Sequence, residues 1–299
     1  MSDSHKHVLD REAAIEHAGK FNKSLSLLNE IIDYGTNLIL RAYKDSPKDE
    51  KAACLIFVFL RQFLVHLDGV AILLSSGNTN TARLQLRSLW EISIVVQWIL
   101  AKDTESKIRH FLVANFRKEK QAHSIAMSES PEAKKYPNLA DFLNASEKLV
   151  KRIPDQMRFL KEYLAQHDLA PIDAKFEKYY LERDYDEDWY VVYGRPSVSR
   201  ISLRKIAKDV GRENEYRLYS YYSQEAHGSD LWRCIKLRPG KESTMTPLRD
   251  ASETNDVLVV AVPLAARLYE MILMEYRPNE ATDNFQRKLK EWKQQSREQ

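Results

Sequence analysis

Residues 83–100 read RLQLRSLWEISIVVQWIL, and this stretch decides the fold. On a helix its apolar side chains point in almost every direction, so no broad polar face remains. A helix of this kind is surrounded by protein. One line along it nevertheless carries Arg83, Arg87 and Glu91, each four residues from the next. Because charged side chains are rarely buried without partners, this line is the first candidate for a polar site.

Two more stretches are apolar on all sides, residues 52–74 and residues 257–273. The first is apolar enough to raise the question of a membrane span, but Arg61, His66 and Asp68 fall near its middle. A charge at the centre of a membrane helix costs roughly 2.5–3.5 kcal/mol on insertion scales. We therefore expect both stretches to be core helices of a bundle rather than membrane spans.

The rest of the chain predicts amphipathic helices around these three. Residues 176–193, FEKYYLERDYDEDWYVVY, are acidic and aromatic, and we expect a short helix that leads into an irregular segment. Strand-like alternation is weak, and residues 189–193 are the only candidate. The fold class we predict is all-α, a single helical bundle with three fully buried helices. It would form one domain over residues 1–280, followed by a basic helical tail over residues 281–299.

Composition excludes several classes of function. The net charge of +3 is too small by itself to indicate a nucleic-acid partner. Two cysteines and an N-terminus without an apolar core predict a reduced, cytoplasmic protein. No glycine-rich phosphate loop and no His-x-x-x-His or Glu-x-x-His spacing is present, so we expect no cofactor and no metal site.

A second polar constellation lies in residues 216–229, YRLYSYYSQEAHGS. Tyr219 and Ser223 share one side of a helix, and His227 follows Ser223 by four residues. A Ser–His pair needs a third group and an oxyanion site to hydrolyse an ester or amide, and neither is visible. His227 before Gly228 also suits a helix C-terminus, where the dipole favours an imidazolium. The sequence leaves both the functional and the structural interpretation of His227 open.

The motifs R87-S-L-W-E91, S202-L-R-K-I-A207 and Y219-S-Y-Y-S223, followed by H227-G-S, resemble a family of proteins. This is the bacterial, all-helical domain-of-unknown-function family 5677, and the resemblance covers about residues 57–229. It implies an R-S-L-x-E helix and a tyrosine-rich stretch that closes in S-x-x-x-H. The shared polar residues that it implies, which we expect to meet in space, are Arg87, Glu91, Tyr219, Ser223 and His227.

A more distant resemblance links the chain to the helical HEPN proteins, whose ribonuclease members use R-x(4–6)-H. Chance predicts roughly two such matches in a chain of this composition, so the motif alone is weak. On a regular helix Arg61 and His66 would also lie about 140° apart. The matches in this sequence are Arg11…His17, Arg61…His66 and Arg117…His123.

Three functions follow from these patterns. In the first, Arg83, Arg87, Tyr219 and Ser223 bind RNA or a nucleotide-like anion. If the protein is an enzyme, His227 is the general acid or base and Glu91 orients it. The second is a HEPN-like ribonuclease, as in a toxin or an anti-phage effector. The third is a non-enzymatic scaffold whose buried charges only fix helix register. No membrane partner is expected, and a homo-oligomer is compatible with the sequence.

Overall fold

The computed structural model describes residues 8–46, 51–127, 129–144, 151–183, 188–194, 201–226, 234–236 and 244–297. Over these ranges the regular secondary structure is helical, apart from a two-residue antiparallel pairing of β1 (Ile235–Lys236) with β2 (Thr244–Met245) and an isolated bridge between Asn78 and Asp250. The all-α class is therefore confirmed.

The chain falls into two compact units, and the first is formed by both ends of the sequence. It comprises Met1–Lys102 with Leu203–Gln299, and the second comprises Asp103–Ser202. Compactness does not establish independent folding, so the single domain over residues 1–280 stays a prediction. The helices of the first unit are α1 (Arg11–Gly19), α2 (Asn22–Asp45), α3 (Lys51–Ser75), α4 (Thr79–Ala101), α12 (Leu203–Asp209), the 3-10 turn η1 (Glu213–Glu215), α13 (Tyr216–Ala226), α14 (Thr254–Tyr276), α15 (Pro278–Thr282) and α16 (Asn284–Arg297).

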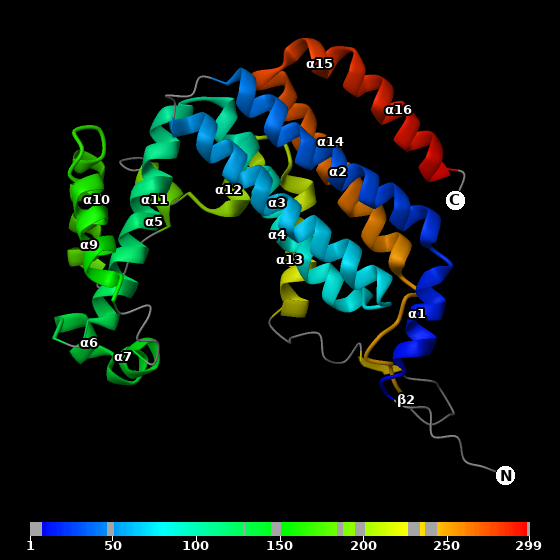
Figure 1. Cartoon of the computed structure of the whole chain (residues 1–299), viewed down its shortest axis with the longest axis horizontal. Coiled ribbons are helices and arrows are strands. Elements are labelled where there is room, and N and C mark those ends of the chain that lie inside the picture. Colours follow the sequence, from blue (N-terminus) through cyan, green and yellow to red (C-terminus); the bar gives the residue numbers. More distant parts are fainter. Residues whose placement is uncertain are drawn as a thin grey trace. The chain divides into compact units, whose positions relative to one another are not determined.

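Residues 83–100 belong to α4, which lies at the centre of the first unit. It contacts α3, α12, α13 and α14, and Figure 1 shows these helices gathered around it. Leu86, Leu89 and Ile94 are fully buried. The turn before α4 places Gly77 in the left-handed region (φ 71°). Asn78 then caps α4 by accepting from the Thr81 amide at 3.3 Å.

The expected basic tail contributes to the core of the first unit. Phe285 and Trp292 on α16 are buried, and both rings contact Tyr34 on α2. The indole of Trp292 also donates to Glu30 at 3.1 Å. In Figure 1, α16 runs alongside α2 and α14. The apolar positions that the sequence predicts on this helix therefore form its buried face.

The second unit is built around α5 (Thr104–Ala126). The expected strand candidate at residues 189–193 is wrong, because these residues form a short helix with a buried Trp189. Residues 176–183 continue a helix, so the acidic-aromatic segment is helical on both sides of residues 184–187, which lie outside the described ranges. Pro154 stands in the first turn of a helix and does not kink a longer one. The other helices are α6 (Pro131–Lys135), α7 (Pro137–Asn144), α9 (Ile153–Leu164), α10 (Ala170–Arg183) and α11 (Trp189–Tyr193).

Two helices of the first unit, α3 and α14, are long and apolar enough to cross a membrane by length and composition alone. Half of each apolar window is buried inside the protein. Core helices of soluble proteins pass the same test, so this finding assigns no location. Both helices also carry exposed aliphatic side chains, among them Ile72 (61% exposed) on α3 and Val259 (69%) on α14.

Candidate functional site

The charged line on α4 is half-buried, and each of its arginines has a partner outside α4. Arg83 forms an ion pair with Glu253, directly before α14. Arg87 donates to the Tyr219 hydroxyl on α13 at 3.2 Å, and its guanidinium carbon lies 5.2 Å from the centroid of that ring. The hydrogen bond of Arg87 thus joins α4 to α13.

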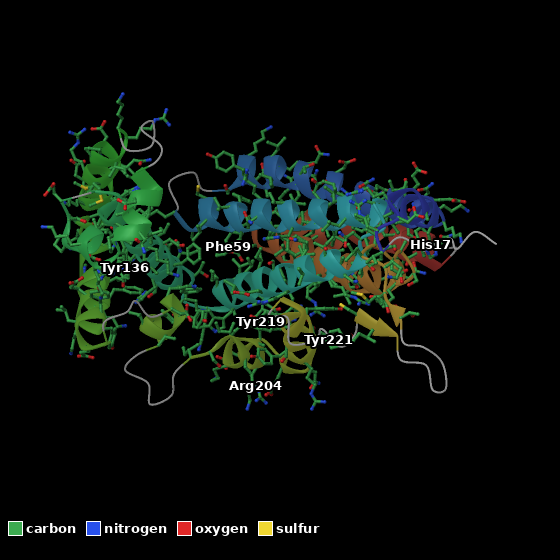
Figure 2. All side chains as sticks on the ribbon, turned by 90° about the horizontal axis from the view of Figure 1, so that it is seen from below. His17, Phe59, Tyr136, Arg204, Tyr219 and Tyr221 are labelled. Carbon is green, nitrogen blue, oxygen red and sulfur yellow. The ribbon has the colours of Figure 1, made fainter. Side chains whose placement is uncertain are left out.

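Tyr219 is the centre of a small aromatic group. Its ring lies 4.9 Å from Trp90 on α4 and 5.5 Å from Tyr216 on its own helix, centroid to centroid; Figure 2 labels its position beside α4. Burial raises the pKa of Tyr219, the negative charge of Glu91 raises it further, and Arg87 partly opposes both. The phenol therefore stays protonated at neutral pH and can donate as well as accept.

Beside this group lies a buried arginine that the sequence analysis missed. The Arg212 side chain is only 4% exposed, and it donates to the Ser93 hydroxyl at 2.9 Å and to Gln97 at 3.5 Å. Its Nε and its other terminal nitrogen both bind one carboxylate oxygen of Glu215. Every nitrogen of the guanidinium is thus occupied. A charged residue after Gly211 in a turn looks exposed in sequence, so only this partner set identifies it.

Glu215 joins three elements through its carboxylate. One oxygen accepts from the Trp90 indole at 3.2 Å as well as from Arg212, and the other accepts from Arg267 on α14 at 2.8 Å. Burial alone would raise the pKa of Glu215, but hydrogen bonds from Arg212 and Arg267 outweigh it and lower the pKa. Burial lowers the pKa of Arg212, and Glu215 opposes that shift. The carboxylate therefore holds α4, η1 and α14 together as an ionised group.

A cavity of about 170 Å³ opens between α4, α13 and α14 next to this network. Its walls combine aromatic rings, aliphatic side chains, two guanidinium groups and one carboxylate. The charges on its wall therefore leave one net positive charge. Its lining residues are Leu86, Trp90, Arg212, Glu215, Leu218, Tyr219, Tyr222, Val259, Val260, Pro263, Leu264 and Arg267.

Of the residues expected to meet, Arg87, Glu91 and Tyr219 are brought together. Ser223 is half-buried on α13, four residues after Tyr219. His227 lies outside the described residues. Arg83 forms its ion pair with Glu253 at the start of α14 and does not line the cavity. Within the described part of the chain, no three His, Cys, Asp or Glu side chains gather in a way that could hold a metal ion.

The R-x(4–6)-H matches lie on three different helices. On α3, Arg61 is exposed, whereas the His66 ring nitrogens lie 2.7 Å from Gln85 and 3.1 Å from Gln62. On α5, Arg117 is held by the carboxylates of Asp173 and Glu177 at 2.9 and 2.8 Å. These contacts give the motif no support, and the HEPN resemblance stays a prediction.

Comparison with known proteins gives a family but no activity. No curated protein and no solved structure matches the chain. The family of unknown function DUF5677 matches residues 53–242, which is more than half of the sequence. The matched range includes α4, the Arg212–Glu215 network and α13, the elements that form most of the cavity wall. The chain therefore belongs to the DUF5677 family.

Proposed function

We propose that this protein binds a nucleotide-like anion in the cavity between α4, α13 and α14. The observation that carries the proposal is the lining of that cavity, where the rings of Trp90, Tyr219 and Tyr222 stand beside the guanidinium groups of Arg212 and Arg267. Aromatic rings stack on the face of any nucleobase, and guanidinium groups bind phosphate with two parallel hydrogen bonds.

The two cavity arginines have different roles in this proposal. Arg212 is buried, and its donors are occupied by Ser93, Gln97 and Glu215. Arg267 is 47% exposed, and its one hydrogen bond within the described residues goes to Glu215. Arg267 can therefore turn toward a phosphate at the mouth of the cavity, while Arg212 keeps Glu215 in place.

The size of the cavity limits what enters it. A cavity of about 150 Å³ holds one benzene ring, whereas pockets that enclose a whole drug-sized ligand measure roughly 300–1,000 Å³. At about 170 Å³, this one admits a single ring system. The base would lie inside, and the ribose and phosphate would stay at the mouth. Arg87 does not line the cavity. In this proposal it positions the Tyr219 ring, and direct binding of an anion by Arg87 stays a prediction.

Calorimetric titration with adenosine 5′-monophosphate tests this proposal. We expect saturable binding by the wild type, weaker binding of adenosine and no binding of inorganic phosphate alone. Arg267→Gln should weaken nucleotide binding by about tenfold to a hundredfold, because a hydrogen bond to a charged group contributes about 1.5–3 kcal/mol.

Arg204→Gln is the matched control. Arg204 is also exposed and pairs with a glutamate of η1, Glu213, at 3.1 Å. It does not line the cavity, and Figure 2 labels it on α12. Its loss should change the affinity less than twofold. If the wild type binds no nucleotide, or if both variants weaken binding equally, the proposal is wrong.

The two alternative functions stay predictions with their own tests. For the ribonuclease, purified protein is incubated with total RNA beside the His227→Ala variant. Cleavage by the wild type alone would support the nuclease, with Glu91 as the orienting partner of His227. For the scaffold, the occupied donors of Arg212 are the favouring observation. A well-folded protein that binds neither nucleotide nor RNA would favour that role.

We also propose a cytoplasmic location. Its support is the charge carried by both long apolar helices, Arg61 and Asp68 on α3 and Arg267 and Glu270 on α14. Each such charge costs roughly 2.5–3.5 kcal/mol near the centre of a bilayer. Fractionation of cells that express the protein at native level tests this. Recovery in the membrane pellet after a high-salt wash would contradict it.

A further inference from the structure

The outer face of α3 carries a regular row of exposed aliphatic side chains. Val58, Val65 and Ile72 are 51%, 50% and 61% exposed, and they are spaced by seven residues. Residues seven apart lie on one line of a helix. Exposed polar side chains, Arg61 and Gln62 and then Asp68, separate the three aliphatic residues, so apolar and charged positions alternate along this face of α3.

Two opposite charges lie within the same row. Arg61 and Asp68 are exposed and fall between the aliphatic residues. They are also seven residues apart, which separates them by about 10 Å along the helix, so they cannot pair with each other. In the part of the chain that the structure describes, neither side chain has an ion-pair partner.

Val58 and Ile72 lie seven residues on either side of Val65, whereas Arg61 lies four residues before it and Asp68 three residues after it. If two copies of α3 lie antiparallel with Val65 facing Val65, then Val58 of each copy faces Ile72 of the other. In the same register, Arg61 of each copy lies one residue, about 1.5 Å along the helix axis, from the level of Asp68 of the other copy, which its long side chain can reach. A parallel pairing would instead bring Arg61 against Arg61 and Asp68 against Asp68. The row is thus complementary to itself in one orientation only, as a two-fold symmetric interface requires.

We propose that α3 is the interface of an antiparallel homodimer, with the Val58–Val65–Ile72 row as its apolar core. Two symmetric Arg61–Asp68 ion pairs set its register. β-Branched residues repeated every seven positions are typical of a two-helix contact. Lipid fits this face less well, because both charges lie in the middle of the row. The face lies on α3, which contributes no residue to the proposed nucleotide cavity, so the inference is independent of that function.

Sedimentation equilibrium of the full-length protein tests the proposal. The wild type should have twice the chain mass at high concentration and dissociate on dilution. Val65→Lys puts a positive charge at the symmetry axis and should weaken dimerisation at least about a hundredfold, since it sets two ammonium groups face to face. Leu181→Lys is the control, because Leu181 is also an exposed aliphatic residue (76%) but lies on α10, away from the row. It should leave dimerisation unchanged.

Charge reversal tests the register. Arg61→Asp and Asp68→Arg should each weaken the dimer about tenfold or more, because two attractive pairs become repulsive. The double variant restores opposite charges across the interface and should regain dimerisation to within about threefold of the wild type. Recovery distinguishes this register from a general loss of folding, which the double variant could not repair.

Three outcomes would overturn the inference. One is a wild type that stays monomeric at every concentration. Another is a dimer that tolerates Val65→Lys as well as it tolerates Leu181→Lys. The third is a monomer that floats with anionic phospholipid vesicles and loses this property in Val65→Lys, which would assign the row to a membrane surface.

Discussion

The Arg212 guanidinium donates to the Ser93 hydroxyl at 2.9 Å, across 119 residues of sequence. Both side chains are buried, Ser93 completely. The bond fixes the turn before η1 against α4, and α13 follows directly, so this contact helps to place Tyr219 against Arg87. Arg212 is thus a buried residue that holds the turn against α4, whereas the other polar residues of this region form a half-exposed cavity wall.

Replacement of Arg212 should lower the free energy of unfolding. Arg212→Ala removes the partner of Glu215 and Ser93 inside the protein, and removal of one member of a buried charge pair costs about 3–5 kcal/mol. We expect the lower end of that range, because Arg267 still binds Glu215. Urea unfolding measures this difference. Arg204→Ala, whose side chain is 67% exposed, should change the free energy of unfolding by less than about 1 kcal/mol. Equal effects of the two variants would contradict the stabilising role of Arg212.

Replacement of Arg87 separates the binding function from the scaffold. Its hydrogen-bond partner is the neutral Tyr219 hydroxyl, so Arg87→Ala should destabilise the protein by only about 1 kcal/mol. The Tyr219 ring would lose the guanidinium beside it, and nucleotide affinity should fall severalfold. Thermal unfolding and calorimetric titration of the same sample measure both. A loss of about 3–5 kcal/mol without any change in binding would instead favour the structural role.

The contact between α2 and α14 makes a prediction about packing. Gly35 lies against Tyr269, and a Cβ at residue 35 would overlap the Tyr269 hydroxyl and Leu64. Gly35→Ala should therefore destabilise the protein by about 1–3 kcal/mol through overpacking. Tyr269→Phe removes the overlapping hydroxyl, along with its hydrogen bond to Ile31 at 3.0 Å. The double variant should be less destabilised than the sum of the single variants, which a double-mutant cycle by urea unfolding measures. Strict additivity would show that the two residues do not collide.

The second unit should lose stability at a higher pH than the first. His110 on α5 is 7% exposed, and its Nε2 is buried without a hydrogen-bond partner among the described residues. Burial lowers its pKa below the ordinary 6.5, although the Ser106 carbonyl opposes the shift. Below about pH 6.5, His110 therefore binds a proton in the unfolded state but stays neutral in the folded state, so the free energy of unfolding falls as the pH is lowered. In the first unit, burial raises the pKa of Glu280, but hydrogen bonds from Arg41 and Arg277 lower it more, so its contribution is lost only below 4.5.

Amide hydrogen exchange checks this difference. Between about pH 7 and about pH 5.5, protection of α5 should fall after correction for intrinsic rates, while protection of α2 and α14 should not. His110→Phe keeps a ring against Tyr193, which it contacts edge-on at 5.4 Å, and removes the titration. Protection of α5 in that variant should no longer depend on pH in this range. An unchanged pH dependence would assign the effect to another group.

Much of the fold follows from apolar periodicity. The core positions of α4 and the buried Phe285 and Trp292 are visible in sequence because burial repeats with the helical period. The exposed row on α3 is not visible in sequence. A helix that is apolar on all sides is predicted to be fully buried, whether its remaining face packs against this chain or against another copy. α1 ends at Gly19 and α2 begins at Asn22, a break that apolar periodicity does not reveal.

The site was predicted in part. The spacing of Arg83, Arg87 and Glu91 identified a polar line on α4, and the tyrosine-rich motif identified its neighbour α13. The family resemblance predicted that Arg87 and Tyr219 would meet, although 132 residues separate them. The partner of Arg83 could not be predicted, because Glu253 lies 170 residues away and belongs to no motif. Arg212 and Arg267 were missed for the same reason. A single arginine in a turn or a helix shows no pattern until the chain folds around it.

The Trp90 indole provides the most direct test of the proposed binding site. Its N–H donates to Glu215 at the cavity wall, whereas that of Trp292 donates to Glu30 on α2. In protein labelled with ¹⁵N-tryptophan, the account predicts that adenosine 5′-monophosphate shifts the Trp90 indole resonance saturably and leaves the Trp292 resonance in place. Replacement of each residue by phenylalanine assigns the two signals. A Trp90 resonance that stays unmoved at saturating nucleotide would contradict the account.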